Sequence, residues 1–207
     1  MLFRSGFALV LISPFVNSFI IGNYFENDSW DVIYVIGYQN TSTTPTTGRY
    51  PENSTRVYIV NNELTNIHDD GIEPLYGVSD SVISHNYIHD SPLANSILMG
   101  HMNSILLWVN SSNIQVNNNV IANMAGDPSK YAHGILLADS HHNTVRNNVI
   151  SNVADHGIFL LWDSAGWSKT TDNIIKDNII FNAPKYGYLN RVNSENLTNL
   201  NTVIINK

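Results

Sequence analysis

Four groups of polar residues that could transfer protons stand directly before a short glycine-led hydrophobic segment. They are Asp69–Asp70 before Gly71, His133 before Gly134, Asp155–His156 before Gly157, and Lys185–Tyr186 before Gly187. Asp70 and Asp155 could serve as acid–base carboxylates or as cation ligands, and the two histidines as proton shuttles. Lys185, together with Arg191, could neutralise a substrate carboxylate. The alternative is that polar residues before glycine only cap the start of a strand and hydrate a loop.

The elements that would position these residues belong to a repeat. Seven copies of a short pattern align on one asparagine, at intervals of 39, 24, 33, 29, 30 and 28 residues. An aliphatic residue stands three positions before each asparagine, and in every full copy an apolar residue follows two positions after it. These offsets stay fixed although the number of residues between copies varies. The pattern therefore indicates a repeated structural unit rather than a chain that is merely rich in asparagine. The aligned asparagines are Asn23, Asn62, Asn86, Asn119, Asn148, Asn178 and Asn206.

Each unit contains three short strand patterns, G-I-x-L, N-x-V and x-I-x, joined by two tight turns and one variable loop. Period-two spacing gives each strand one apolar face. No strand can bury that face alone, whereas stacking successive units buries all of them. The sequence therefore predicts an all-β fold, a right-handed single-stranded parallel β-helix (a solenoid) of about seven coils. We expect one domain over residues 1–207, with a long polar loop insertion at 38–55.

The aligned asparagines are expected at the bend between the second and third strands, where they would recur every ~4.8 Å along the stack. Asparagine tolerates the left-handed backbone that a sharp bend needs. Its amide can also donate to the next copy, as in stacked asparagine ladders. We therefore predict that the six asparagines from Asn23 to Asn178 form a structural ladder.

The N-terminal stretch MLFRSGFALVLISPFVNS has the charge and apolar run of a signal peptide. It also aligns with a full copy of the repeat, so we predict an ordinary coil there, and no signal peptide is securely identified. No cap is recognisable at either end, which leads us to expect a segment truncated at both ends.

Side chains that alternate with the core positions of the glycine-led strands are expected to face outward. This set is rich in large apolar groups and could be a stacking platform for sugar rings, because aromatic faces bury apolar C–H surface. Alternatively, a long loop or a neighbouring subunit covers it. The residues predicted to contact a substrate are Trp108, Phe159, Trp162 and Trp167, together with Arg191.

Composition excludes several classes of protein. The net charge is −7 with only ten Lys plus Arg, which argues against a nucleic-acid partner. The chain has no cysteine, so disulfides and thiolate metal sites are excluded. Hydrophobic residues make up 43% of the chain, which is enough to form a core. No segment approaches the length of a membrane-spanning helix.

Metal and cofactor sites are weakly indicated. The adjacent His141 and His142 suggest a metal pair, but neighbouring residues on a strand point to opposite faces, so we expect solvated turn histidines. Ca²⁺ is possible because the turns are rich in oxygen donors, although no calcium loop of fixed spacing is present. The sequence supports no zinc or copper site and no certain cofactor.

The repeat unit, best matched from Asp70 to Tyr186, resembles the parallel β-helix repeats of the pectate-lyase-like superfamily. That group includes polysaccharide lyases, some glycoside hydrolases, alginate C5-epimerases, phage tailspikes and a periplasmic protein that matures nitrous oxide reductase. The resemblance implies an extracytoplasmic protein, whether secreted, periplasmic or at the cell surface, with a polysaccharide or glycan as partner. The calcium aspartates of pectate lyases and the aspartate set of polygalacturonases are not intact here.

Two functions therefore remain open. The first is a segment of a polysaccharide lyase, epimerase or glycoside hydrolase, working along a polymer in the groove. In a lyase or epimerase, the histidines would contact a uronate sugar, and Lys185 and Arg191 would neutralise its carboxylate. The second is a non-catalytic adhesin or tailspike-like binding module. Fold alone does not decide between them.

Overall fold

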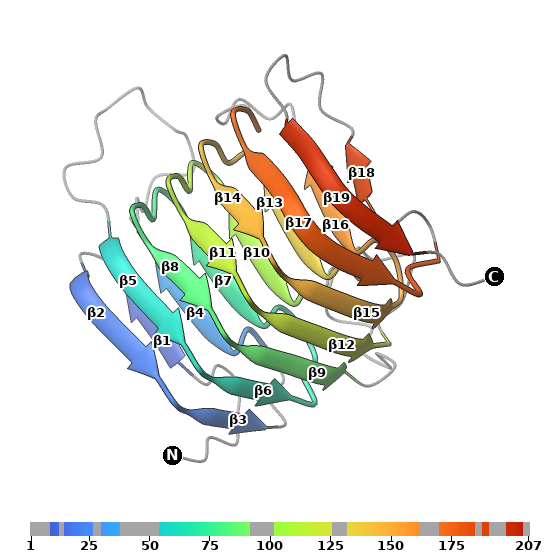
Figure 1. Cartoon of the computed structure of the whole chain (residues 1–207). Helices are drawn as coiled ribbons and strands as arrows, with labels where there is room; N and C mark the ends of the chain where they lie inside the picture. Colours follow the sequence, from blue (N-terminus) through green and yellow to red (C-terminus); the bar gives the residue numbers. More distant parts are fainter. Residues whose placement is uncertain are drawn as a thin grey trace.

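The computed structural model describes residues 9–12, 15–26, 30–37, 54–91, 102–125, 132–161, 170–184, 188–190 and 198–204. These residues form short strands that pair in parallel with the equivalent strands of the preceding and following coils, and Figure 1 shows the resulting stack. The predicted all-β parallel β-helix is thus confirmed. No helix in the described part of the chain is long and apolar enough to cross a membrane.

Two sheets make up the stack. Sheet A contains β1 (Leu9–Ile12), β4 (Ile33–Ile36), β7 (Ile72–Leu75), β10 (Ile105–Trp108), β13 (Ile135–Ala138), β16 (Ile158–Leu161) and β18 (Tyr188–Asn190), in that order. These are the glycine-led strands of the repeat and their equivalents in the other coils.

Sheet B is bent into two limbs, visible in Figure 1 as two runs of arrows joined at a corner. The first limb has β2 (Val16–Ile21), β5 (Thr55–Val60), β8 (Val82–Ser84), β11 (Gln115–Asn117) and β14 (Thr144–Arg146). The second has β3 (Tyr24–Glu26), β6 (Glu63–Thr65), β9 (Tyr87–Ser91), β12 (Val120–Met124) and β15 (Val149–Val153). Strand β17 (Ile174–Phe181) pairs with both limbs, and β19 (Thr198–Ile204) pairs with β17.

The register of sheet A places equivalent residues of successive coils side by side. Ile72 is the partner of Ile33 in β4 and of Ile105 in β10, and the same row continues through Ile135 and Ile158. Because this register is unbroken, the polar residues two positions before each isoleucine must also lie in one row. The fold thereby assembles the candidate site.

Alternation along each strand divides the apolar residues between two clusters. Inward residues of sheets A and B form one continuous core. On the outer face of sheet A, Leu106, Leu136, Ala138 and Phe159 form a second buried cluster, with Trp108 and Leu161 partly buried against it. Burying each large side chain contributes ~1.5–3 kcal/mol, so the inner cluster supplies most of the driving force.

The six asparagines from Asn23 to Asn178 occupy one column at the corner between the limbs of sheet B. In the first five of them, Asn23 to Asn148, the backbone N–H and the Nδ2 donate to Oδ1 of the asparagine one coil later, at 2.9–3.0 Å. From Asn62 onward, Nδ2 also donates to a backbone carbonyl of the preceding coil. The acceptor is the aliphatic residue three positions before that coil's own asparagine. Each interior amide is therefore fully satisfied without water.

The predicted backbone conformation of these asparagines was wrong by one position. The left-handed φ belongs to the residue immediately before each of them: Gly22, Asn61, His85, Asn118, Asn147 and Asp177, with φ of 67°, 55°, 56°, 56°, 55° and 56°. The residue with the left-handed φ therefore makes the bend. The asparagine that follows it points its side-chain amide toward the neighbouring coils. Glycine, asparagine and aspartate are the residues that adopt this conformation most readily.

The N-terminal stretch that resembled a signal peptide contributes β1 and β2, which pair with β4 and β5 of the following coil. Of the predicted loop insertion, residues 38–53 lie outside the described residues.

Replacing Asn119 by alanine should destabilise the fold by at least ~3 kcal/mol. The change removes the acceptor of the Asn86 N–H and Nδ2 groups and the donor to the Ile83 carbonyl, and each buried group left unsatisfied costs ~1–3 kcal/mol. Urea denaturation measures the loss. Asn123→Gly is the control, because Asn123 is exposed and has a φ of 58° that glycine adopts freely; a similar loss in both variants would contradict the prediction.

Candidate active site

The candidate site is a column of polar side chains, here called the edge column, at the start of the strands of sheet A. Its members stand two positions before the first residue of a strand: Asp31, Asp70, Asn103, His133 and His156. All five are buried, with exposed fractions of 0–7%. Backbone hydrogen bonds of 2.9–3.1 Å between successive coils, such as Gly134 N–H to the His156 carbonyl, hold the column in step. The sequence-predicted residues Asp70, His133 and His156 are thus brought together.

One half of the edge column is acidic. Asp31, Asp69 and Asp70 each place a carboxylate oxygen within 4.8 Å of the other two. The backbone N–H and Nδ2 of Asn103 donate to Oδ1 of Asp70 at 2.6 and 2.9 Å, and the Asp70 N–H donates to Oδ1 of Asp31 at 3.3 Å. These are the oxygen donors that Ca²⁺ prefers, so the possible Ca²⁺ site would lie here.

Glu73 joins this acidic half from the outer face of β7. Burial and, after it, the negative charges of Asp70 and Asp31 raise the pKa of the Glu73 carboxyl from 4.5 to about 11. Its cross-strand neighbour Tyr34 has a pKa raised by burial and by the Glu73 charge. With its pKa raised in this way, the buried Glu73 carboxyl is expected to keep its proton at neutral pH.

The other half of the edge column is built from imidazoles. The Nδ1 atoms of His133 and His156 are 3.3 Å apart, and Asp155 places Oδ2 3.7 Å from the first and Oδ1 2.9 Å from the second. The ring of Phe159 stacks on His156 and meets His133 edge-on, with centroid distances of 4.9 and 4.6 Å. All four side chains are buried.

Several predicted residues cannot be placed. Lys185, Trp162, Trp167 and Arg191 lie outside the described residues. Conversely, sequence reasoning missed Asp31, Asn103 and Glu73. The signal for the first two was their position two residues before the strand, which was overlooked because valine or serine replaces the following glycine. The signal for Glu73 was its charge, which no other described strand residue of sheet A carries.

The outer apolar face of sheet A is closed rather than open. Phe159 is 1% exposed, and Leu136 5%. Trp108 is partly buried against the same cluster. Of the two alternatives that the sequence left open, a covered face therefore fits the described residues better than an exposed stacking platform.

The adjacent histidines lie elsewhere. Their Nδ1 atoms are 2.8 Å apart, and His142 Nε2 is 3.9 Å from Asp172. His141 is partly buried and His142 is exposed. Burial, and then the charge of His142, lower the pKa of His141.

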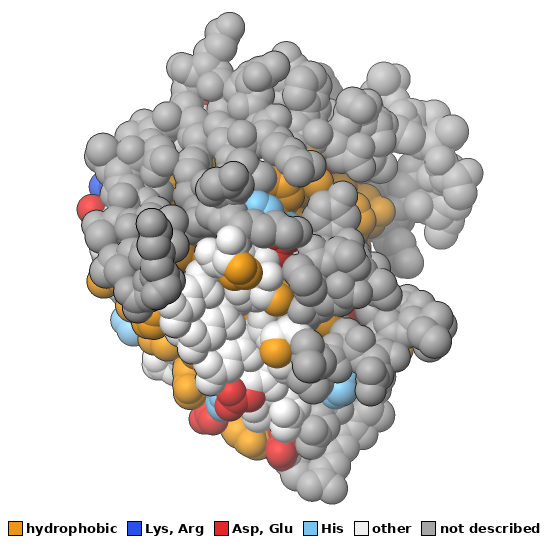
Figure 2. Space-filling view, turned by 90° about the vertical axis from the view of Figure 1, so that its right-hand side faces the viewer, with side chains coloured by type: hydrophobic (Ala, Val, Ile, Leu, Met, Phe, Trp, Pro, Cys, Tyr) orange, Lys and Arg blue, Asp and Glu red, His pale blue; other side chains and the backbone are white. Residues whose placement is uncertain are grey.

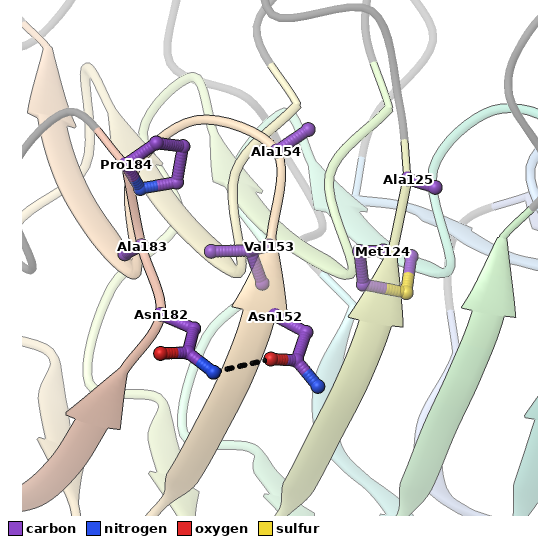
Figure 3. Close-up of a pocket in the computed structure, with 8 residues that line it drawn as sticks. All are labelled: Met124, Ala125, Asn152, Val153, Ala154, Asn182, Ala183 and Pro184. Atoms are coloured by element: carbon purple, nitrogen blue, oxygen red, sulfur yellow. Dashed lines mark hydrogen bonds between the residues drawn. The ribbon is translucent and has the colours of Figure 1, made fainter. Parts of the chain in front are cut away.

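A hollow of about 470 Å³ opens beside the ends of β12, β15 and β17 (Figure 3). Asn152 and Asn182 line it, and Nδ2 of Asn182 donates to Oδ1 of Asn152 at 2.8 Å. The remaining lining residues are Met124, Ala125, Val153, Ala154, Ala183 and Pro184. None of the described lining residues is titratable.

Figure 2 shows a side of the molecule on which much of the described surface is white, meaning uncharged polar side chains and backbone. Acidic and apolar side chains appear mainly at the margins of this white area. Within the described part of this side, charged side chains are few.

Comparison with known proteins agrees with this architecture. A family model described as the right-handed beta helix region matches residues 8–204, so the chain belongs to the right-handed β-helix family. Comparison with curated protein sequences gives no match.

Two solved structures are similar. One is the periplasmic alginate epimerase AlgG, with a TM-score of 0.73 and 14% identity, covering 100% of this chain and 44% of the epimerase. The other is a mannuronic acid specific polysaccharide family 6 lyase from human gut microbiota, with a TM-score of 0.30 and 11% identity, covering 99% of this chain and 75% of the lyase. The chain thus spans less than half the length of the epimerase, and the likeness to it is one of fold.

The buried carboxyl of Glu73 should make stability fall as pH rises. Its pKa is higher in the folded chain than in the unfolded chain, so between 4.5 and about 11 the folded state binds the extra proton. This one group therefore lowers the free energy of unfolding by up to ~1.4 kcal/mol per pH unit across that window. Glu73→Gln should flatten this slope in urea denaturation at pH 5 to 9.

The matched control for that experiment is Asp80→Asn, because Asp80 is exposed and asparagine keeps its left-handed backbone. We expect the pH slope of this variant to equal that of the unmodified chain. An unchanged slope in Glu73→Gln would show that the Glu73 carboxyl is ionised in the folded state.

Proposed function

We propose that this chain is part of an extracytoplasmic protein that acts on a polysaccharide, and that it hydrolyses a neutral glycan by acid–base chemistry at Asp31, Asp70 and Glu73. The observation that carries the proposal is the buried carboxyl of Glu73 on β7, next to the buried Asp31 and Asp70, with a pKa that burial and the neighbouring negative charges raise. A stack of coils favours an extended ligand, because the starts of the sheet A strands recur at a regular interval along it.

Hydrolysis of a glycosidic bond needs two carboxyl groups with different protonation states. Glu73 would donate its proton to the leaving glycosidic oxygen. Asp70 would be the second carboxyl group, acting on the sugar carbon or on a water molecule once substrate reaches these buried side chains. Burial and the neighbouring negative charges raise the pKa of the Glu73 carboxyl, which suits it to the acid role.

Charge supports a neutral substrate. The acidic half carries three aspartates, and the described Lys and Arg residues, Arg56, Arg146 and Lys176, all lie in strands of sheet B. A lyase or epimerase must neutralise a sugar carboxylate, and the described residues of sheet A supply no cationic side chain for that purpose. Lys185 and Arg191, predicted for that role, lie outside the described residues.

A bound cation would change the substrate class. With Ca²⁺ held by Asp31, Asp69 and Asp70, the same face could accept an anionic polymer, because the ion would bridge protein and sugar carboxylates. Assays should therefore compare neutral glycans with uronate polymers, each with and without added Ca²⁺.

Turnover should appear as new reducing ends from a neutral glycan, without the ultraviolet absorbance of an unsaturated lyase product. Glu73→Gln and Asp70→Asn should each lower kcat by at least ~100-fold, because each removes one acid–base group. Asp80→Asn, on the exposed surface, should leave kcat unchanged.

Three outcomes would overturn the proposal. They are full activity in Glu73→Gln, an unsaturated product from uronate polymers, or glycan binding without turnover. The last would favour a non-catalytic binding module.

A further inference from the structure

The imidazole half of the edge column has a geometry that the proposed glycan hydrolysis does not use. His133 precedes β13, while Asp155 and His156 precede β16 one coil later. Two backbone hydrogen bonds, Gly134 N–H to the His156 carbonyl at 2.9 Å and Asp155 N–H to the Ala132 carbonyl at 3.1 Å, fix one segment against the other. The relative position of the three side chains is therefore set by the main chain.

Their donor atoms converge on one point. The two Nδ1 atoms are 3.3 Å apart, and the Asp155 oxygens lie 3.7 and 2.9 Å from them. Three ligands bound at ~2.0–2.1 Å to one tetrahedral ion would be ~3.3–3.4 Å apart. The separation of the two Nδ1 atoms matches that value, and one ligand atom from each of the three residues lies within 4.8 Å of the others. Because the two Asp155 distances belong to different carboxylate oxygens, the carboxylate would have to rotate to place one oxygen on the ion.

The ring planes are held in that orientation by packing. Phe159 lies face to face with His156, at an interplanar angle of 15°, and edge-on to His133, at 60°. Neither imidazole can rotate freely against this ring, because all three side chains are at most 5% exposed. A site whose ligands are fixed before binding loses little conformational entropy when the ion enters.

We propose that His133, Asp155 and His156 bind one divalent transition-metal ion, with Zn²⁺ as the best fit. Two imidazole nitrogens and one carboxylate oxygen are the ligand set of many zinc sites, whereas Ca²⁺ takes oxygen ligands almost exclusively. Three protein ligands leave the fourth tetrahedral position for water or another ligand. From the sequence, His133 and His156 were expected to act as proton shuttles, and no zinc site was predicted there.

Metal binding tests this directly and does not depend on glycan hydrolysis. The full chain, freed of metal with a chelator, is titrated with Zn²⁺ in a calorimeter and separately with Co²⁺ under a visible spectrometer. We expect one Zn²⁺ per chain, and with Co²⁺ the intense visible bands of a four-coordinate ion. His133→Ala combined with His156→Ala should abolish both signals.

Asp155→Asn provides a second variant that keeps the shape of the side chain. Removing the carboxylate charge should weaken Zn²⁺ binding by at least ~10-fold while circular dichroism shows an intact fold. This variant keeps the test decisive if the double alanine variant does not fold.

The chain also supplies a matched control. His141 and His142 also have Nδ1 atoms close together, 2.8 Å apart, but His142 is exposed and His141 only partly buried. Asp172 lies 3.9 Å from Nε2 of His142, not from the Nδ1 atoms that face each other. His141→Ala combined with His142→Ala should retain one-to-one Zn²⁺ binding. The proposal is overturned if the surface pair accounts for the bound Zn²⁺, or if Asp155→Asn binds it as tightly as the unmodified chain.

Discussion

Hydrogen bonding between successive coils is the constraint on which the rest of this molecule depends. A strand in the stack can satisfy the hydrogen bonds of its backbone only through the coils before and after it. Every coil must therefore stay in register with its neighbours. The asparagine column enforces this at a corner where strand pairing is interrupted. Each interior amide accepts two hydrogen bonds from the preceding coil and donates to both neighbours, so a coil that slipped would leave buried polar groups unsatisfied.

The same alignment that satisfies the amides also concentrates charge. Asp31 and Asp70 are placed on adjacent coils by register, and Glu73 is three residues further along the strand. Carboxylates buried this close together repel one another, and desolvation adds to the cost. The structure meets part of that cost with hydrogen bonds from Asn103 and with a proton retained on Glu73. Residues that destabilise a fold in this way are commonly kept for chemistry.

The fold was predictable because its signals are local and repeated. Fixed offsets between aliphatic residues and asparagines predicted the strands and their stacking. The conformation of the corner was misplaced by one residue because asparagines often stand in pairs, as at Asn61 and Asn62 or Asn147 and Asn148. Composition cannot tell which member turns the chain and which enters the stack. Only backbone geometry separates them.

The candidate site was predictable only in part. The shared offset to glycine was enough to group Asp70, His133 and His156, and it also drew attention to Asp155. It failed for Asp31 and Asn103, where the glycine is absent. The charge of Glu73 stands out among the described strand residues of sheet A, but its burial could not be predicted. A glutamate on an outward strand position is ordinarily solvated, and the burial of Glu73 depends on parts of the chain distant in sequence. The convergence of two Nδ1 atoms on one carboxylate depends on ring rotation, which a linear pattern does not encode.

The column of amides has a consequence for how such a molecule can change over evolutionary time. Consecutive asparagines in the column are separated by as few as 24 and as many as 39 residues, yet their hydrogen bonds have the same length. Connecting segments can therefore gain or lose residues without disturbing the stack. Tandem duplication or deletion of a whole coil would likewise leave every remaining amide with an equivalent neighbour. Genes for such chains can lengthen in modular steps, and surface segments can diversify while the scaffold is conserved.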